Sequence, residues 1–211
     1  RRATDRGPFL QIGTLVRLDP DLGPHYVLAD MTIPQAHRVG MFAIGKLSSA
    51  EIEEAVAVQA SVLRESEHVF TLSDWARRSV IDDFGIDPDR VTTVYAGPNL
   101  RVPSHLCEPK SPQEILFVGI DWERKGGPLL AEAFALLRRR LPDATLRVIG
   151  CQPDIHAPGV HVEGYMDRRD PAQFERICRH YLRAACFCLP SVFDPFPIAI
   201  IEAASVGLPV V

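Results

Sequence analysis

Short and almost continuously apolar runs alternate with amphipathic stretches along this chain of 211 residues, and this alternation constrains its fold more than any other feature. Ile115–Ile120 is one such run, and it lacks the regular polar positions of a strand with one solvated face. Apolar strands of this kind are typical of parallel sheets covered by helices on both faces. Repeated strand–helix units with such strands therefore predict an α/β fold.

The candidate elements fall into two series. In the first, the strand candidates are Phe9–Arg17, His25–Leu28, His68–Leu72 and Val91–Ala96. The spacing of Ser48 and Glu51 predicts a capping box that starts a helix. Ser73 is placed to cap a second helix over Asp74–Phe84. In the second series, the strand candidates are Ile115–Ile120, Ala144–Ile149, Val160–Val162, Cys186–Leu189 and Pro209–Val211, and the helices start near Pro128, Asp170 and Ile198.

A polar stretch over residues 97–113, interrupted by four prolines, separates the two series. Such a stretch is typical of a linker. We expect residues 1–100 to form the C-terminal part of a first domain, residues 101–113 a linker, and residues 114–211 the N-terminal part of a second. Both domains are predicted to be doubly wound and Rossmann-like. Because the last strand candidate breaks off, we expect both domains to be incomplete and the chain to be a fragment.

Composition excludes several classes of protein. The hydrophobic share of 46% and the charged share of 24% are those of a globular chain. A net charge of −4 argues against a nucleic-acid-binding protein, which is usually basic. Five cysteines without a C-x-x-C pair predict free buried thiols and a reducing, cytoplasmic compartment. The seven histidines show no ligand spacing, so we assign no metal. Asp194, Glu202 and four prolines interrupt the apolar C-terminal stretch, which rules out a spanning helix there.

The loop Gly119–Gly127 carries the first signal of chemistry, because it joins a predicted strand to a predicted helix. Its glycines let a phosphate approach the backbone, the following helix offers unpaired N–H groups, and Lys125 adds a positive charge. A solvated basic loop explains the same residues equally well. The loop matches neither a P-loop nor a dinucleotide-binding fingerprint.

The second signal is an acid among apolar neighbours. Glu202 lies about one turn inside a predicted helix whose other residues are almost all apolar, where an ionised carboxylate needs hydrogen-bond partners. The two oxygens of a carboxylate suit the adjacent hydroxyls of a diol. The N-terminus of that helix, near Ile198, suits a diphosphate, and Asp194 lies just before it. The alternative is that Glu202 caps the backbone amides of a neighbouring loop.

The chain resembles glycosyltransferase family 4, retaining enzymes with the two-domain GT-B fold, from about Pro24 to Val211 and most specifically from Glu114 onward. The resemblance rests on Phe117-Val118-Gly119, Lys125-Gly126, Gly150, Gly164, Asp194-Pro-Phe-Pro with Glu202-Ala, and Gly207-Leu-Pro-Val-Val, which occur in the family's order. It implies that residues 1–100 lie on the acceptor side and residues 114–211 bind the nucleotide-sugar donor.

The resemblance also implies roles for individual residues. Asp194 contacts the donor sugar as the catalytic acidic residue, and Glu202 binds the ribose hydroxyls. The other implied donor-binding residues are Gly119, Arg124, Lys125 for the diphosphate, Tyr165 and Met166 for the base, and the backbone amides of Ile198 and Ala199.

The sequence departs from the family at two places. Ile120 stands where the family often has Arg, and Arg124 is the candidate to supply that charge. Asp30 stands where the first domain of the family often has a catalytic His, and a turn or helix-capping role competes with a catalytic one. His37 lies nearby and is a further candidate to reach inward.

The predicted function is retaining transfer of a sugar from a nucleotide-sugar donor to a glycan, lipid-linked or small-molecule acceptor, with neither cofactor nor metal and no nucleic-acid partner. The alternatives are a nucleotide-sugar 2-epimerase of the same architecture and an inert donor-binding fragment. The Arg138–Arg140 run is either a solvated helix end or a contact with an anionic membrane, so the predicted location is cytoplasmic, with peripheral binding to the inner face of the membrane as an option. The sequence names neither the sugar, the base nor the acceptor.

Overall fold

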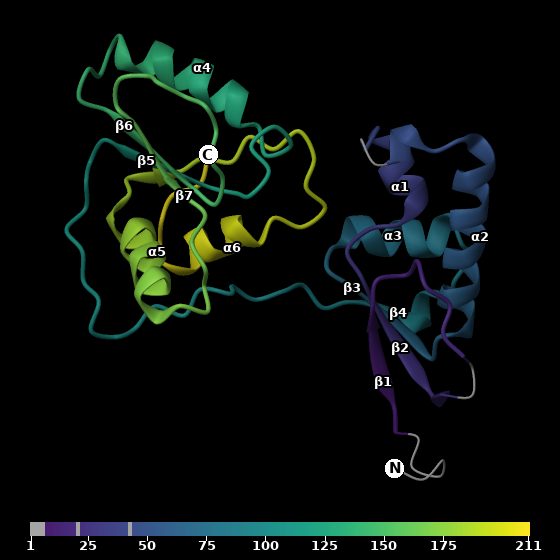
Figure 1. The fold of residues 1–211 in the computed structure, drawn as a ribbon. Helices are drawn as coiled ribbons and strands as arrows, with labels where there is room; N and C mark the ends of the chain where they lie inside the picture. The colour runs from purple at the N-terminus through teal and green to yellow at the C-terminus, as the bar shows by residue number, and fades with distance from the viewer. Residues whose placement is uncertain (1–6, 20–21, 42–43) are drawn as a thin grey trace. The chain divides into compact units, whose positions relative to one another are not determined.

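The computed structural model describes residues 7–19, 22–41 and 44–211, and in them the chain forms two compact units, residues 1–96 and 97–211. Each unit contains a four-stranded parallel sheet with helices packed against it (Figure 1). The predicted α/β fold with doubly wound, Rossmann-like units is therefore confirmed. None of the helices in the described part of the chain combines the length and apolar character needed to span a bilayer.

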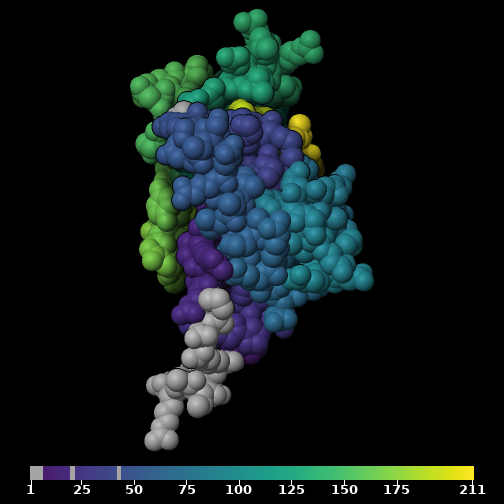
Figure 2. Space-filling model, turned by 90° about the vertical axis from the view of Figure 1, so that its right-hand side faces the viewer, coloured from purple at the N-terminus to yellow at the C-terminus, as the bar shows by residue number. Residues whose placement is uncertain are grey.

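The first unit has the strand order β1-β2-β3-β4, with every neighbouring pair parallel. Its strands are β1 (Phe9–Ile12), β2 (His25–Ala29), β3 (His68–Thr71) and β4 (Val91–Thr93). Its helices are α1 (Ile33–Arg38), η2 (Ile44–Lys46), α2 (Ser49–Glu65), α3 (Asp74–Asp82) and η3 (Pro88–Arg90). In the space-filling view, the blue residues of α2 lie beside the blue-green residues that follow them in the first unit (Figure 2).

Local signals in the first unit agree with the structure except at strand ends. The capping box of Ser48 and Glu51 starts α2, and the Ser73 hydroxyl accepts a hydrogen bond from the Ala76 amide at the start of α3. The predicted strand Phe9–Arg17 stops at Ile12, because Gly13 adopts a φ of 87° that ends extended structure. The predicted strand Val91–Ala96 is also shorter in the structure and ends at Thr93.

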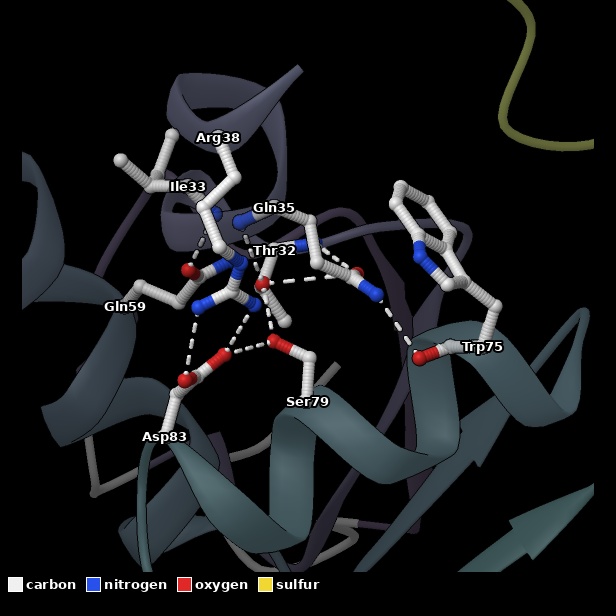
Figure 3. A network of polar contacts seen from close by, with 8 residues as sticks. All are labelled: Thr32, Ile33, Gln35, Arg38, Gln59, Trp75, Ser79 and Asp83. Carbon is white, nitrogen blue, oxygen red and sulfur yellow. Dashed lines mark hydrogen bonds and ion pairs between the residues drawn. The ribbon is translucent and has the colours of Figure 1, made fainter.

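A buried polar network fixes α1 in the first unit (Figure 3). Thr32 caps α1 in a reciprocal capping box with Gln35, and its hydroxyl lies 2.6 Å from that of Ser79 on α3. The Gln59 side chain on α2 accepts a hydrogen bond of 2.8 Å from the Ile33 amide. Because these groups are buried, each needs the partner it has, and α1 is thereby held against both α2 and α3.

The second unit has the strand order β7-β6-β5-β8, with a bridge from Phe187 to Val210 where the last strand was predicted. Its strands are β5 (Glu114–Val118), β6 (Thr145–Ile149), β7 (Val160–Gly164) and β8 (Cys186–Phe187). Its helices are α4 (Gly127–Arg138), α5 (Pro171–Arg183) and α6 (Ile198–Ser205). Figure 1 shows α4 on one side of the sheet and α5 and α6 on the other. The core between these layers includes Phe117, Leu146 and Phe187, all fully buried.

The segment predicted as a linker packs against the second unit. Leu106 of this segment is buried in the same apolar cluster as β5 and β6, and so is Leu100, which was predicted to lie in the first domain. The Ser111 amide donates to the Arg183 carbonyl at 2.8 Å. The segment forms neither helix nor strand, which is why its sequence lacks periodicity. The five cysteines are free, but the prediction that all are buried is wrong: Cys178 is buried, Cys107 in this segment is exposed, and Cys151, Cys186 and Cys188 are partly buried.

The loop between β5 and α4 is held against the loop after β8 by a close backbone approach. Gly126 adopts a φ of 77°, and a Cβ there would overlap the carbonyl oxygen of Pro190. The Val192 amide donates to the Arg124 carbonyl at 2.9 Å, and the Arg124 guanidinium donates to the Phe193 carbonyl at 3.0 Å. Only glycine satisfies both the backbone conformation and the space at position 126.

We expect Gly126→Ala to lower the free energy of unfolding of the second unit by more than about 2 kcal/mol, since it adds overlap with Pro190 to the cost of a positive φ. The matched control is Gly207→Ala, whose φ of 70° is similar but whose Cβ would meet open space. This control should cost about 1 kcal/mol. Urea unfolding followed by Trp122 fluorescence, in a Trp75→Phe background, measures the free energy of unfolding of both variants. Equal losses in the two variants would contradict the role assigned to the Pro190 contact.

Candidate functional site

A cavity of about 630 Å³ lies at the carboxyl ends of the strands in the second unit. The chain order of the sheet reverses between β5 and β8, so the connections that leave these two strands diverge to opposite faces. Open α/β sheets bind their ligands at such a switch point. The cavity is lined from the ends of β5, β6 and β7 and from α6, so its position is the one that the topology favours.

Every donor-binding residue predicted from the sequence lines this cavity. They are Gly119, Arg124, Lys125, Tyr165, Met166, Ile198, Ala199 and Glu202. Asp194 does not line it directly, but its carboxylate accepts a hydrogen bond from the Lys125 ammonium. The side chains of Lys125 and Asp194 are both largely buried. The structure therefore brings together residues that lie up to 83 positions apart in the sequence, from Gly119 to Glu202.

Glu202 is satisfied by side chains and not by main-chain amides. The residue is 1% exposed, and its Oε1 and Oε2 accept hydrogen bonds of 2.5 and 2.8 Å from the two terminal nitrogens of Arg168. The buried Tyr181 hydroxyl donates to Oε2 at 2.8 Å. Burial raises the pKa of the Tyr181 phenol, and the adjacent Glu202 carboxylate raises it further, so Tyr181 stays a neutral donor. The competing explanation, in which Glu202 caps a loop, does not fit these contacts.

The N-terminus of α6 faces the same cavity. Pro197 occupies the N-cap position and makes no side-chain hydrogen bond to the helix, while Ile198 and Ala199 line the cavity. The first amides of a helix have no partner within the helix and carry part of its positive dipole. They are therefore available to an anion in the cavity.

Apolar and aromatic side chains line another part of the cavity. Tyr165 follows β7 with 70% of its surface exposed, and Met166 beside it is buried in the core. Ile120, which stands where the resembled family often has Arg, is 73% exposed at the rim. Behind it, burial raises the pKa of the Cys151 thiol to about 11, and the charge of Asp121 adds to this, so Cys151 is a protonated thiol near neutral pH.

Asp30, the candidate catalytic residue of the first unit, is exposed in the loop after β2. It does not cap α1, because Thr32 does. His37 is exposed in α1. In residues 7–19, 22–41 and 44–211, no three His, Cys, Asp or Glu side chains are grouped so as to hold a metal ion.

Sequence reasoning missed Arg168 and Tyr181, the two partners of Glu202. Glu202 itself was the sequence signal for such a partner, because a buried carboxylate in an apolar helix requires a cation or several hydrogen-bond donors. Arg168 follows β7 and is one of two adjacent arginines there, but its pairing with a residue 34 positions away is set by the fold.

Comparisons with known proteins find a family model that matches most of the second unit. Residues 112–211 match the profile of a family described as "Glycosyl transferases group 1". A D-inositol 3-phosphate glycosyltransferase from Kineococcus radiotolerans is 26% identical over an alignment 211 positions long, which covers 85% of this chain and 48% of the relative. The chain spans about a third to a half of the length of the curated relatives that it matches.

Solved structures show the same fold. WaaG, a glycosyltransferase involved in lipopolysaccharide biosynthesis, superimposes with a TM-score of 0.67 at 18% identity, covering 95% of this chain and 58% of WaaG. The pneumococcal O-GlcNAc transferase GtfA, solved in complex with UDP and GlcNAc, gives 0.60 at 12% identity, covering 89% and 37%. The two units therefore have the fold of GT-B glycosyltransferases, and residues 112–211 match the glycosyl transferases group 1 family.

Proposed function

We propose that the chain is part of an enzyme that transfers a sugar from a nucleotide-sugar donor to an acceptor with retention of anomeric configuration. The observation that carries the proposal is the gathering of Lys125, Glu202 and the N-terminus of α6 around one cavity at the switch point of the second sheet. The family match of residues 112–211 and the GT-B fold support the reaction class.

The donor diphosphate is assigned to the part of the cavity between Lys125 and the first turn of α6. An ammonium group and free helix amides are suited to phosphate oxygens. As the bond between the sugar and the diphosphate breaks, negative charge grows on the leaving oxygen. Groups that are already oriented toward that charge stabilise the transition state. Asp194, paired with Lys125 just before α6, is assigned to the donor sugar.

The nucleoside is assigned to the opposite part of the cavity. Glu202 supplies carboxylate oxygens for the two ribose hydroxyls, and Tyr165 with Met166 contacts the base. The exposed ring of Tyr165 offers a face on which a planar base can stack. The proposed acceptor is a glycan, a lipid or a small molecule, and Asp30 is the acidic catalytic candidate of the first unit. Cytoplasmic location, and membrane contact through Arg138–Arg140, stay predictions.

We expect Lys125→Ala to weaken binding of a nucleoside diphosphate by roughly 10- to 100-fold, because a charge-assisted hydrogen bond contributes about 1.5–3 kcal/mol. Titration calorimetry with UDP, GDP and ADP measures this. Arg140→Ala, which removes an exposed cation at the end of α4, is the control and should leave the affinity unchanged. Unchanged affinity in Lys125→Ala would count against the donor site.

Tyr165→Ala is expected to weaken binding of the same nucleoside diphosphate by roughly 5- to 100-fold, since stacking of a base on an aromatic ring contributes about 1–3 kcal/mol. Tyr165→Phe keeps the ring and removes only the hydroxyl, so its affinity should stay close to that of the unaltered chain. A loss of equal size in both variants would show that the hydroxyl, and not the ring face, makes the contact.

Product analysis separates transfer from epimerisation. Without acceptor, a transferase is expected to hydrolyse its donor slowly at most, and NMR of any released sugar should show first the anomer present in the donor. A nucleotide sugar epimerised at carbon 2 would identify the alternative activity. Release of the opposite anomer would overturn the assignment of retention.

A further inference from the structure

Four cations and four acids form ion pairs around the cavity. Each cation that lines the cavity has a carboxylate partner: Arg124 with Asp121 at 3.2 Å, Lys125 with Asp194, Arg168 with Glu202 at 2.5 Å, and Arg169 with Asp167 at 2.9 Å. The charges of these side chains therefore cancel within the second unit. A carboxylate partner weakens the attraction between each of these cations and a diphosphate, so separation of a pair would strengthen binding.

The Arg124 and Arg169 pairs are poorly suited to separate toward the cavity. Arg124 also donates to the Phe193 carbonyl and helps to hold two loops together. Arg169 has 89% of its side chain exposed and pairs with Asp167 two residues before it, outside the buried part of the site. Neither pair contains a deeply buried acid that a ligand hydroxyl could satisfy in place of the cation. The Lys125–Asp194 pair is already assigned to the diphosphate and the donor sugar, which leaves the Arg168–Glu202 pair to be considered.

The Arg168–Glu202 pair has an asymmetry that favours separation by a ligand. Glu202 is fixed on α6 and almost fully buried, whereas Arg168 follows β7 in a turn with 36% of its side chain exposed. Arg168 is therefore the partner that can move. Glu202 uses both of its oxygens on Arg168, and an oxygen that already accepts from Arg168 and Tyr181 has both lone pairs engaged. A diol can reach both oxygens only if Arg168 leaves at least one of them.

We propose that Arg168 is a donor-binding residue that exchanges partners, leaving Glu202 for the diphosphate when the nucleotide enters. This inference rests on the proposed function and extends it. In this structure the guanidinium neutralises Glu202. In the occupied site the ribose hydroxyls donate to Glu202, Tyr181 keeps its hydrogen bond, and the guanidinium presents its planar donors to phosphate oxygens, a geometry that it fits bidentately. The ribose hydroxyls of the ligand thus replace Arg168 as partners of Glu202, and its phosphate oxygens become the new partners of Arg168.

The exchange makes a prediction that a merely structural Arg168 does not. Arg168→Gln is expected to lower affinity for the nucleoside diphosphate at least tenfold, while affinity for the corresponding nucleoside stays the same or rises, because Glu202 is then free for the ribose. The preference for diphosphate over nucleoside should shrink at least tenfold. If Arg168 only holds Glu202 in place, both affinities fall together and the preference is unchanged, which would overturn the proposal.

The experiment uses the full chain and three probe pairs, UDP with uridine, GDP with guanosine and ADP with adenosine, titrated by calorimetry and ligand-observed NMR. Arg176→Gln is the matched control, because it breaks the 3.0 Å pair between Arg176 on α5 and Glu163 on β7, and neither residue lines the cavity. This control should keep the preference for the diphosphate. Arg168→Lys retains a cation at this position and should keep part of the preference for the diphosphate over the nucleoside.

Folding defects are separated by a second variant. If Arg168→Gln is unfolded, Arg168→Gln combined with Glu202→Gln removes both charges without leaving one of them buried and unpaired. It should show the same loss of preference for the diphosphate. If the unaltered chain binds none of the six probes, the proposed function fails and the inference falls with it. If the chain binds and Arg168→Gln keeps the preference, the inference alone fails.

Discussion

The neutralisation of one buried carboxylate determines the arrangement of the second unit's cavity. Glu202 lies on an apolar helix where an unpaired charge would be strongly destabilising, and its contacts recruit Arg168 from the end of β7 and Tyr181 from α5. These contacts tie α6 to two elements that precede it in the chain. The need to pair Glu202 shapes the cavity, because Arg168 and Glu202 both line it and Tyr181 holds Glu202 from behind the lining.

The topology of the sheet explains why so many polar groups meet there. In the order β7-β6-β5-β8, the helices that follow β5 and β8 lie on opposite faces, as α4 and α6 do in Figure 1. The two connecting loops must part at the carboxyl ends of the strands. Because Gly126 has no side chain, the loop after β5 can nevertheless contact the loop after β8 at Pro190. This contact brings Lys125 and Asp194 together. A parallel sheet without this reversal would leave no such crevice.

Local signals made much of this fold predictable from the sequence. The capping box at Ser48 and the N-cap at Ser73 depend on neighbouring residues only, and the structure confirms both. Position after a strand and within a helix marked Lys125 and Glu202 as two separate candidates, and only the family resemblance implied that they belong to one site. The contacts that could not be predicted are long-range: the pairing of Arg168 with Glu202, and the packing of Leu100 into the second core from a stretch without periodicity. Strand ends were misjudged where a single glycine, Gly13, turns the backbone.

A second buried acid shows that burial of charge does not by itself indicate a binding site. Glu114 is fully buried in the second unit and pairs with Arg147 at 3.1 Å, and Arg147 also pairs with Glu163 at 2.5 Å. Glu114 begins β5, at the amino end of the strand, and none of these three residues lines the cavity at the carboxyl ends. Buried ion pairs seldom exceed apolar packing as a source of stability. What distinguishes Glu202 is therefore its surroundings, since it shares a cavity with an uncapped helix N-terminus and a lysine, whereas the Glu114 cluster joins strand to strand.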